Sequence, residues 1–187
     1  MLEVMHMTKT FATEEYITAA EIKTVRKRLG LSQKDFAILV GSSKPTIERW
    51  ESSDNHITGP IVLLCQMLMR EPEYVKDIQI KEKEYPLRMW YMHDRAYCTE
   101  IQVDDMNRKV KIYNYVDNVV YRAFGVIEKP TYADYEEFLE TRCFPSTRDK
   151  MKYVLEDLGL PFYDTLMIIE KTEGRMAEDH FWIKLDQ

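Results

Sequence analysis

The sequence predicts a mainly α N-terminal domain of five helices, followed by a small α+β domain with an antiparallel sheet. From residue 18 to about residue 80, apolar residues recur at helical spacing behind capping residues. After a charged linker, aromatic and β-branched residues form short runs between polar turns, and helical spacing returns after Pro130. The expected parts are an extension at 1–17, a domain at 18–80, a linker at 81–85 and a domain at 86–187.

The first helix is expected after Thr18, because Thr18 and Glu21 have the spacing of a capping box, and Gly30 ends it. Ser32 and Asp35 have the same spacing and open a second helix. In the extension we expect three apolar residues to pack onto the first helix: Phe11, Tyr16 and Ile17.

A third helix is expected after Ser43, with Pro45 in its first turn, where the missing N–H is harmless. Ile47 and Trp50 lie three apart and define its inner face. The fourth and fifth helices are expected at Pro60–Arg70, and from Pro72 through Ile78.

The second domain is expected to begin with four strands rich in aromatic and β-branched residues. These are Leu87–His93, Tyr97–Val103, Lys109–Tyr115 and Val119–Phe124. The turns between the later strands fall at Asp104–Arg108 and at the hairpin dipeptide Asp117-Asn118.

Three helices are expected after Pro130, capped by Thr131, Ser146 and Asp164. Gly159 is expected to end the second of them. Phe181–Leu185 has the composition of a last short strand.

Charge is distributed unevenly along the 187 residues, whose net charge is −6. The segment Thr18–Trp50 holds seven basic and three acidic residues, or +4. From Thr131 to the end there are seven basic and thirteen acidic residues, or −6. A basic N-terminal part and an acidic C-terminal part indicate that the first binds nucleic acid and that the second has another function.

Several protein classes are not favoured by the composition. There is no apolar run of about 20 residues, as a membrane span needs, and no signal-like layout at the start. The three cysteines, Cys65, Cys98 and Cys143, are far apart, so neither a disulfide framework nor a zinc site is indicated. We expect a cytoplasmic protein without metal or cofactor.

The most informative segment runs from Leu29 to Glu51 and reads LGLSQKDFA, then GSSKPTIERWE after three residues. Ala37 is small where two helices would cross, and Gly41 permits a sharp turn between them. With the inner face of the third helix buried, we expect the side chains of Lys44, Thr46 and Arg49 to point outward.

In this order and spacing, residues 18–80 resemble the XRE (lambda-repressor-like) helix-turn-helix family. The resemblance implies a DNA-binding domain whose third helix enters the major groove. Gln33 would contact phosphate or a base edge, and Ser43, Lys44 and Pro45 would lie at the exposed start of the recognition helix. Lys44 would donate to guanine, and Pro45 would touch a thymine methyl group.

Thr46 and Arg49 would bind phosphate and so position the helix rather than read sequence. Pro45 is a departure from the family, which often places a hydrogen-bonding side chain there. The alternative is a helical hairpin used only for packing or dimerisation.

Within that family, the stretch 17–75 looks most like the DNA-binding half of MqsA-type antitoxins. The similarity lies in the helix opening at 18–21, the Leu-Ser-Gln-Lys turn at 31–34 and the segment Arg70-Glu71-Pro72-Glu73-Tyr74. Those antitoxins also carry a zinc domain built on paired cysteines, which this sequence lacks, so the implication stops at DNA binding.

The C-terminal segment 131–185 resembles uncharacterised proteins associated with HipA-like kinase toxins, which implies a regulatory or antitoxin chain. The most enzyme-like cluster in it is Arg142, Arg148 and Arg175 with Glu178 and Asp179. Such charges near helix ends are usually caps and ion pairs, and no phosphate loop or nucleophile motif is present. We therefore do not expect an enzyme.

Together these features predict a sequence-specific regulator that binds double-stranded DNA as a homodimer on a palindromic operator. One alternative is an antitoxin that binds a toxin through the acidic domain at 86–187. Another is a ligand sensor or small enzyme in that domain, which requires a pocket where the arginines and carboxylates converge.

Overall fold

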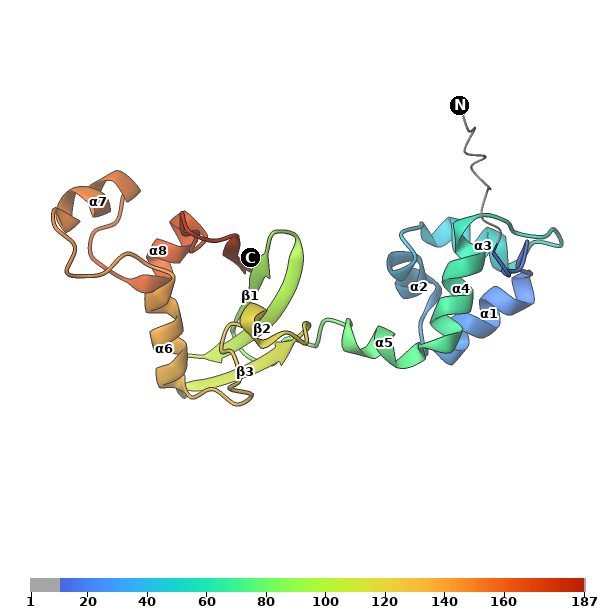
Figure 1. The fold of residues 1–187 in the computed structure, drawn as a ribbon, viewed down its shortest axis with the longest axis horizontal. Coiled ribbons are helices and arrows are strands. Elements are labelled where there is room, and N and C mark those ends of the chain that lie inside the picture. Colours follow the sequence, from blue (N-terminus) through green and yellow to red (C-terminus); the bar gives the residue numbers. More distant parts are fainter. Residues whose placement is uncertain (1–10, 187) are drawn as a thin grey trace, which may run out of the picture. The chain divides into compact units, whose positions relative to one another are not determined.

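The computed structural model describes residues 11–186 and shows two compact units, Met1–Gln79 and Ile80–Gln187 (Figure 1). The segment 1–10, part of the expected extension, lies outside the described residues. In the described part of the chain, no helix is long and apolar enough to cross a membrane.

The first unit consists of five helices, as predicted. They are α1 (Ala19–Arg28), α2 (Gln33–Leu39), α3 (Lys44–Glu51), α4 (Pro60–Arg70) and α5 (Pro72–Asp77). Their shared core centres on the fully buried Ile22, Phe36 and Ile47. The spacing of apolar residues in the sequence predicted that these positions lie on the inner faces of their helices.

The helix starts follow the capping pattern. Thr18 and Glu21 form the complete capping box, with Thr18 N–H donating to Glu21 Oε2 at 2.8 Å. Ser32 accepts from the Asp35 N–H at 3.2 Å, but its hydroxyl donates to Asp35 Oδ2 at 2.6 Å. The second box is thus incomplete: the Asp35 carboxylate accepts a hydrogen bond from the Ser32 hydroxyl, as Glu21 does from Thr18, but it accepts none from the Ser32 N–H.

The extension packs only in part as expected. Ile17 is buried and exchanges two backbone hydrogen bonds with Ile57, at 2.8 and 2.9 Å. Tyr16 stacks on the ring of His56 rather than on α1. The expectation for Phe11 was wrong, because its side chain is 78% exposed.

The second unit is a four-stranded antiparallel sheet in the order β3-β2-β1-β4 with helices on one face. The strands are β1 (Leu87–His93), β2 (Ala96–Asp104), β3 (Lys109–Asn114) and β4 (Phe181–Leu185). The helices are η1 (Val119–Tyr121), α6 (Tyr132–Thr141), α7 (Met151–Leu158) and α8 (Thr165–Thr172). The predicted α+β architecture is confirmed.

One face of the sheet forms the core of this unit. Met89, Ile101 and Ile183 lie on neighbouring strands and pack with Phe138 of α6 and Ile168 of α8. Alternation along each strand turns the intervening residues to the opposite face.

The expected strand Val119–Phe124 and its hairpin at Asp117-Asn118 were wrong. The Asn118 side chain accepts from the Val120 N–H at 3.1 Å and so caps a 3-10 turn, η1, instead of opening a hairpin. Arg122 Nε then donates to the Val116 carbonyl at 2.9 Å and holds the turn closed. The fourth strand of the sheet is β4, from the end of the chain.

The expected cap at Ser146 was also wrong. The helix α7 begins only at Met151, after Lys150 in a left-handed conformation with φ 59°. The Arg148 N–H donates to the Pro145 carbonyl at 3.0 Å, so a turn occupies the residues where the helix was expected. Gly159, with φ 68°, ends α7 as predicted.

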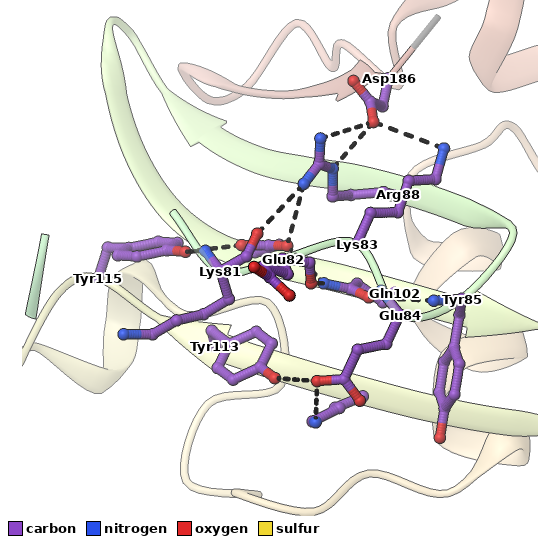
Figure 2. A network of polar contacts seen from close by, with 12 residues as sticks. Lys81, Glu82, Lys83, Glu84, Tyr85, Arg88, Gln102, Tyr113, Tyr115 and Asp186 are labelled. Atoms are coloured by element: carbon purple, nitrogen blue, oxygen red, sulfur yellow. Dashed lines mark hydrogen bonds and ion pairs between the residues drawn. The ribbon is translucent and has the colours of Figure 1, made fainter. Parts of the chain in front are cut away.

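The segment 81–85, expected as a linker, lies on the face of the sheet opposite the core, and we call it the strap (Figure 2). The buried Gln102 holds it in place. Its Oε1 accepts from the N–H groups of Glu84 at 2.6 Å and Tyr85 at 3.2 Å, while its Nε2 donates to the Glu82 carbonyl at 2.9 Å. These bonds attach the strap to the second unit.

Beneath the strap, the fully buried Glu100 is satisfied on both oxygens. Gln102 Nε2 donates to Oε1 at 2.7 Å, and the Tyr115 hydroxyl donates to Oε2 at 2.6 Å (Figure 2). Because a buried carboxylate is costly unless it is hydrogen-bonded, this network fixes the position of the strap on β2.

Candidate nucleic-acid interface

The joint between α2 and α3 has the sharp turn that the sequence indicated. Ala37 is buried between the helices, and Gly41 adopts φ +64°. The Ser42 N–H donates to the Ala37 carbonyl at 2.8 Å and the Gly41 N–H to Ile38 at 3.2 Å. A side chain at Gly41 would strain this left-handed conformation, so glycine sets the angle between the two helices.

The helix α3 is anchored by its inner face and capped at its start. Ile47 is fully buried and Trp50 half-buried. Ser43 caps the helix, with its Oγ accepting from the Thr46 N–H at 3.3 Å. These contacts present the first turn of α3 to solvent.

Three of the predicted contact residues on α3, Lys44, Pro45 and Arg49, are exposed. The Lys44 Nζ lies 3.0 Å from Glu48 Oε1, one turn further along the helix. These two side chains are 55% and 47% exposed, so the pair is worth little and Lys44 is available for another acceptor. The Arg49 guanidinium has no hydrogen bond or ion pair with any residue that the structure describes, although the Arg49 carbonyl accepts from the Ser52 hydroxyl at 3.3 Å.

Ser43 and Thr46 are partly committed to the fold, since their hydroxyls lie 2.9 Å apart. Ser43 is exposed and Thr46 half-buried. The expected phosphate contact of Thr46 would therefore use an oxygen that is already hydrogen-bonded to the cap.

Gln33, the sixth predicted contact residue, belongs to a network that joins three helices. Its Nε2 donates to Glu51 Oε2 at 2.9 Å. Glu51 also forms a two-pronged ion pair with Arg26, whose Nη1 donates to the Leu31 carbonyl at 3.0 Å. The side chains of Arg26 and Glu51 are only 13% and 5% exposed. The hydrogen bond from Arg26 lowers the pKa of the Glu51 carboxyl below its ordinary value, against the effect of burial.

Sequence reasoning missed this pair, because its members lie 25 residues apart and Glu51 lies just outside the segment whose charges were counted. Counted from Thr18 to Glu51, there are seven basic and four acidic residues, or +3. Of the cations, Arg26 is neutralised internally. The exposed cations are Lys23, Lys27, Arg28, Lys34, Lys44 and Arg49.

The enzyme-like cluster of the second unit is built around a structural ion pair. Arg142 is 6% exposed and binds Asp179 through Nη1–Oδ2 at 2.7 Å and Nη2–Oδ1 at 3.1 Å. It also donates to the carbonyls of Gly174 at 3.0 Å and Phe181 at 2.9 Å. The hydrogen bond from Arg142 lowers the pKa of Asp179. This arginine therefore joins α6 to the start of β4.

The remaining members of the cluster do converge on one space. A cavity of about 380 Å³ is lined by Arg142, Arg148, Arg175 and Glu178, with apolar walls that include Phe144. Arg148 and Arg175 are exposed, and Arg175 Nε lies 2.7 Å from Glu173 Oε2. Since Arg142 and Arg175 are paired with Asp179 and Glu173, Arg148 is the arginine of this lining that has no ion pair with a described residue.

The thiols do not form a reactive group. Cys65, Cys98 and Cys143 are buried and unpaired, and burial raises the pKa of Cys65 and of Cys143 to about 11. Within residues 11–186, no three His, Cys, Asp or Glu side chains gather as a metal site would require.

Comparison with known families supports the assignment of the first unit. The helix-turn-helix family model HTH_3 matches residues 22–66, from the first turn of α1 into α4. No curated protein matches the chain. The matched segment contains the Gly41 turn, the buried Ile47 and every predicted contact residue. Residues 22–66 are therefore a helix-turn-helix domain of the XRE type.

Proposed function

We propose that this protein is a transcriptional regulator that binds specific DNA sequences as a dimer. The observation that carries the proposal is the helix-turn-helix at 22–66, whose third helix presents Lys44, Pro45 and Arg49 to solvent. Exposed cations on α1 and α2 add the positive surface that phosphate binding needs.

In this proposal some residues contact base edges and so read the sequence, whereas others bind phosphate and position the helix. Lys44 donates to guanine O6 or N7, and Pro45 packs on a thymine methyl group. Arg49 binds phosphate. Gln33, held at the start of α2 by Glu51, lies where its second amide hydrogen and its carbonyl are left for a phosphate or a base edge.

The dimer follows from the size of the recognition element. The helix α3 has eight residues, and its exposed first turn reaches only a few base pairs. Two copies related by a two-fold axis read two half-sites about one helical turn apart, and this repetition supplies the specificity that one helix lacks.

The direct test is binding of the purified protein to DNA from upstream of its own gene, against scrambled DNA of the same composition. Affinity is measured over a salt series. Preferential binding that weakens steeply with salt supports the proposal. Equal affinity for both DNAs, or no binding at low salt, means that the domain serves packing here, and the proposal is wrong.

A second candidate is favoured by the arginine-lined cavity, namely that the second unit senses a small anionic ligand. The test is a thermal-shift screen of aromatic and aliphatic carboxylates and phosphates, with Arg148→Ala as the variant that should abolish any shift. An antitoxin role stays a prediction, to be tested by recovery of a stable complex with the product of a neighbouring gene.

A further inference from the structure

The second unit has two outer strands, β3 and β4, and they differ in how their free edges are protected. The edge of β3 carries Lys109 and Lys111, and charged side chains, lysine above all, discourage pairing with another strand. β4 reads Phe-Trp-Ile-Lys-Leu and has only one lysine. Its edge is the less protected of the two.

Hydrogen bonds show which groups of β4 face outward. The Asp186 N–H donates to Arg88 of β1 at 3.0 Å, whereas the Ile183 N–H donates away from the sheet, to the Glu173 carbonyl at 2.7 Å. Phe181, Ile183 and Leu185 therefore direct their backbone groups to the free edge. Arg142 and Asp179 already satisfy those of Phe181.

Leu185 is different, because neither its N–H nor its C=O has a hydrogen-bond partner among residues 11–186. Beside it lies a cavity of about 600 Å³ between β4 and α8, with Leu87, Ile169 and Leu185 among its lining residues. The open part of this edge thus combines unpaired backbone groups with a groove that has apolar walls at Leu87, Ile169 and Leu185 and a charged rim that includes Glu170 and Lys171. Strand addition uses such free backbone groups for affinity and neighbouring grooves for side chains.

We propose that a second copy of this chain pairs with this edge, β4 against β4, antiparallel and with the two-fold axis at Leu185. The two Leu185 residues exchange both backbone hydrogen bonds, and each leucine side chain enters the groove beside the other. The same register places Lys184 directly opposite Asp186 of the second copy, twice, on the other face of the sheet. The inference rests on the dimer of the proposed function and gives that dimer a surface.

Both charged groups have capacity left for this contact. Arg88 and Lys83 bind the same oxygen of Asp186, Oδ2, at 2.8 and 3.5 Å, and no described residue bonds to Oδ1 (Figure 2). Lys184 is exposed, and among the described residues its Nζ hydrogen-bonds to the Tyr97 hydroxyl at 3.0 Å and lies 5.2 Å from the centre of the Trp90 ring. Two of its three N–H donors remain for Asp186 of the second copy.

The proposed strand pairing is limited in length at one end. Because Glu173 occupies the edge beside Ile183, the pairing extends over residues 184–186 and no further toward Phe181. An interface of this length is small, and it gives a weak dimer that two adjacent DNA half-sites strengthen by raising the local concentration.

The test is a complementary charge exchange in the full-length protein without DNA, measured by sedimentation over a concentration series. Lys184→Glu places Glu opposite Asp186, and Asp186→Lys places Lys opposite Lys184, so each variant alone should dimerise at least about tenfold more weakly. Mixed in equal amounts, they form a heterodimer with one Glu–Lys pair and one Asp–Lys pair, for which near wild-type affinity is expected.

Leu185→Pro is an independent variant, since it removes both the outward N–H and the leucine side chain of the proposed contact and should also abolish dimers. Lys109→Glu, on the edge of β3, is the matched control and should leave the dimer intact. Circular dichroism verifies that each variant is folded.

The proposal is overturned if the wild-type chain stays monomeric, if the variants dimerise normally, or if the mixture fails to associate. DNA binding by a monomer would overturn this interface without contradicting DNA recognition.

Discussion

Lys44 and Arg49 lie on the same helix but should contribute differently to DNA binding. Lys44→Ala is expected to weaken binding to the specific site more than binding to random DNA, since a base contact carries the sequence information. Arg49→Ala should weaken both alike and reduce the salt slope by about one. Competition titrations with both DNAs measure this, and Lys109→Ala in the second unit is the control. If neither variant changes affinity, the recognition helix has been assigned wrongly.

The buried pair of Arg26 and Glu51 should be the most sensitive polar contact of the first unit. Glu51→Gln leaves the guanidinium buried without a counter-charge, and we expect a loss of about 3 kcal/mol in the free energy of unfolding. The exposed pair of Lys44 and Glu48 is the matched control, because Glu48→Gln should cost less than about 0.5 kcal/mol. Urea unfolding of both variants compares them. Equal losses would contradict the structural role of Glu51.

The same carboxyl predicts a pH dependence. Since folding lowers the pKa of Glu51 from 4.5, its contribution to stability is complete above pH 4.5 and is lost as the pH falls through the folded-state pKa. The difference in stability between wild type and Glu51→Gln should therefore shrink on acidification below pH 4.5. A difference that stayed constant down to pH 3 would show that the ionised form gives no extra stability.

Gly174 is the glycine with the least room for a side chain. At φ +58°, an added Cβ would lie 3.3 Å from both the Arg142 Cβ and the Ile183 Cδ1. Gly159 has a similar φ of +68° and open space around it. We expect Gly159→Ala to cost about 1 kcal/mol from backbone strain alone, and Gly174→Ala about 2 kcal/mol or more. Thermal unfolding tests the order, and the reverse order would refute the packing argument.

At the scale of elements, structure encoded by neighbouring residues was predicted well. Thr18, Thr131 and Asp164 cap α1, α6 and α8 as expected, because a cap depends on a side chain and an N–H three residues away. The error at Val119–Phe124 has the opposite cause. Its β-branched composition is real, but Asn118 and Arg122 close the chain into a turn, and composition does not report such bonds.

For the candidate site, the sequence indicated the recognition helix but not the environment of each side chain. Lys44, Pro45 and Arg49 are exposed as expected. The bond from Gln33 to Glu51 and the sharing of hydroxyls by Ser43 and Thr46 depend on distances set by packing. Helical periodicity gives the face on which a residue lies, and it does not give the partner across a helix crossing.

The strap provides a prediction at this scale. Gln102→Leu removes the acceptor of the Glu84 and Tyr85 N–H groups, and both amides should exchange with solvent at least about tenfold faster. Lys111→Ala is the control, since it removes an exposed ion pair to the Glu84 side chain and leaves the backbone bonds in place. Hydrogen exchange read by mass spectrometry resolves the segment. Unchanged exchange in Gln102→Leu would mean that other contacts hold the strap.

At the scale of the whole molecule, each unit has its own core. Buried residues from Ile17 to Val75 form one cluster, and those from Met89 to Ile183 form the other. Composition and charge already indicated a basic part and an acidic part. They could not reveal that the charged run at 81–85 would lie on the sheet, because its anchor, the buried Gln102, is indistinguishable in sequence from a solvated strand residue.

Because the strap is attached to the sheet, only a very short tether joins the helix-turn-helix unit to the second unit. Only Ile78, Gln79 and Ile80 separate the end of α5 from the first anchored amide, that of Lys81, and three residues span at most about 11 Å. A dimer with such tethers should accept one half-site spacing and reject operators lengthened by half a turn of DNA. Inserting about eight Gly and Ser residues after Gln79 should relax that preference. Binding to operators of graded half-site spacing measures the change. An insertion without effect would show that the tether does not set the spacing.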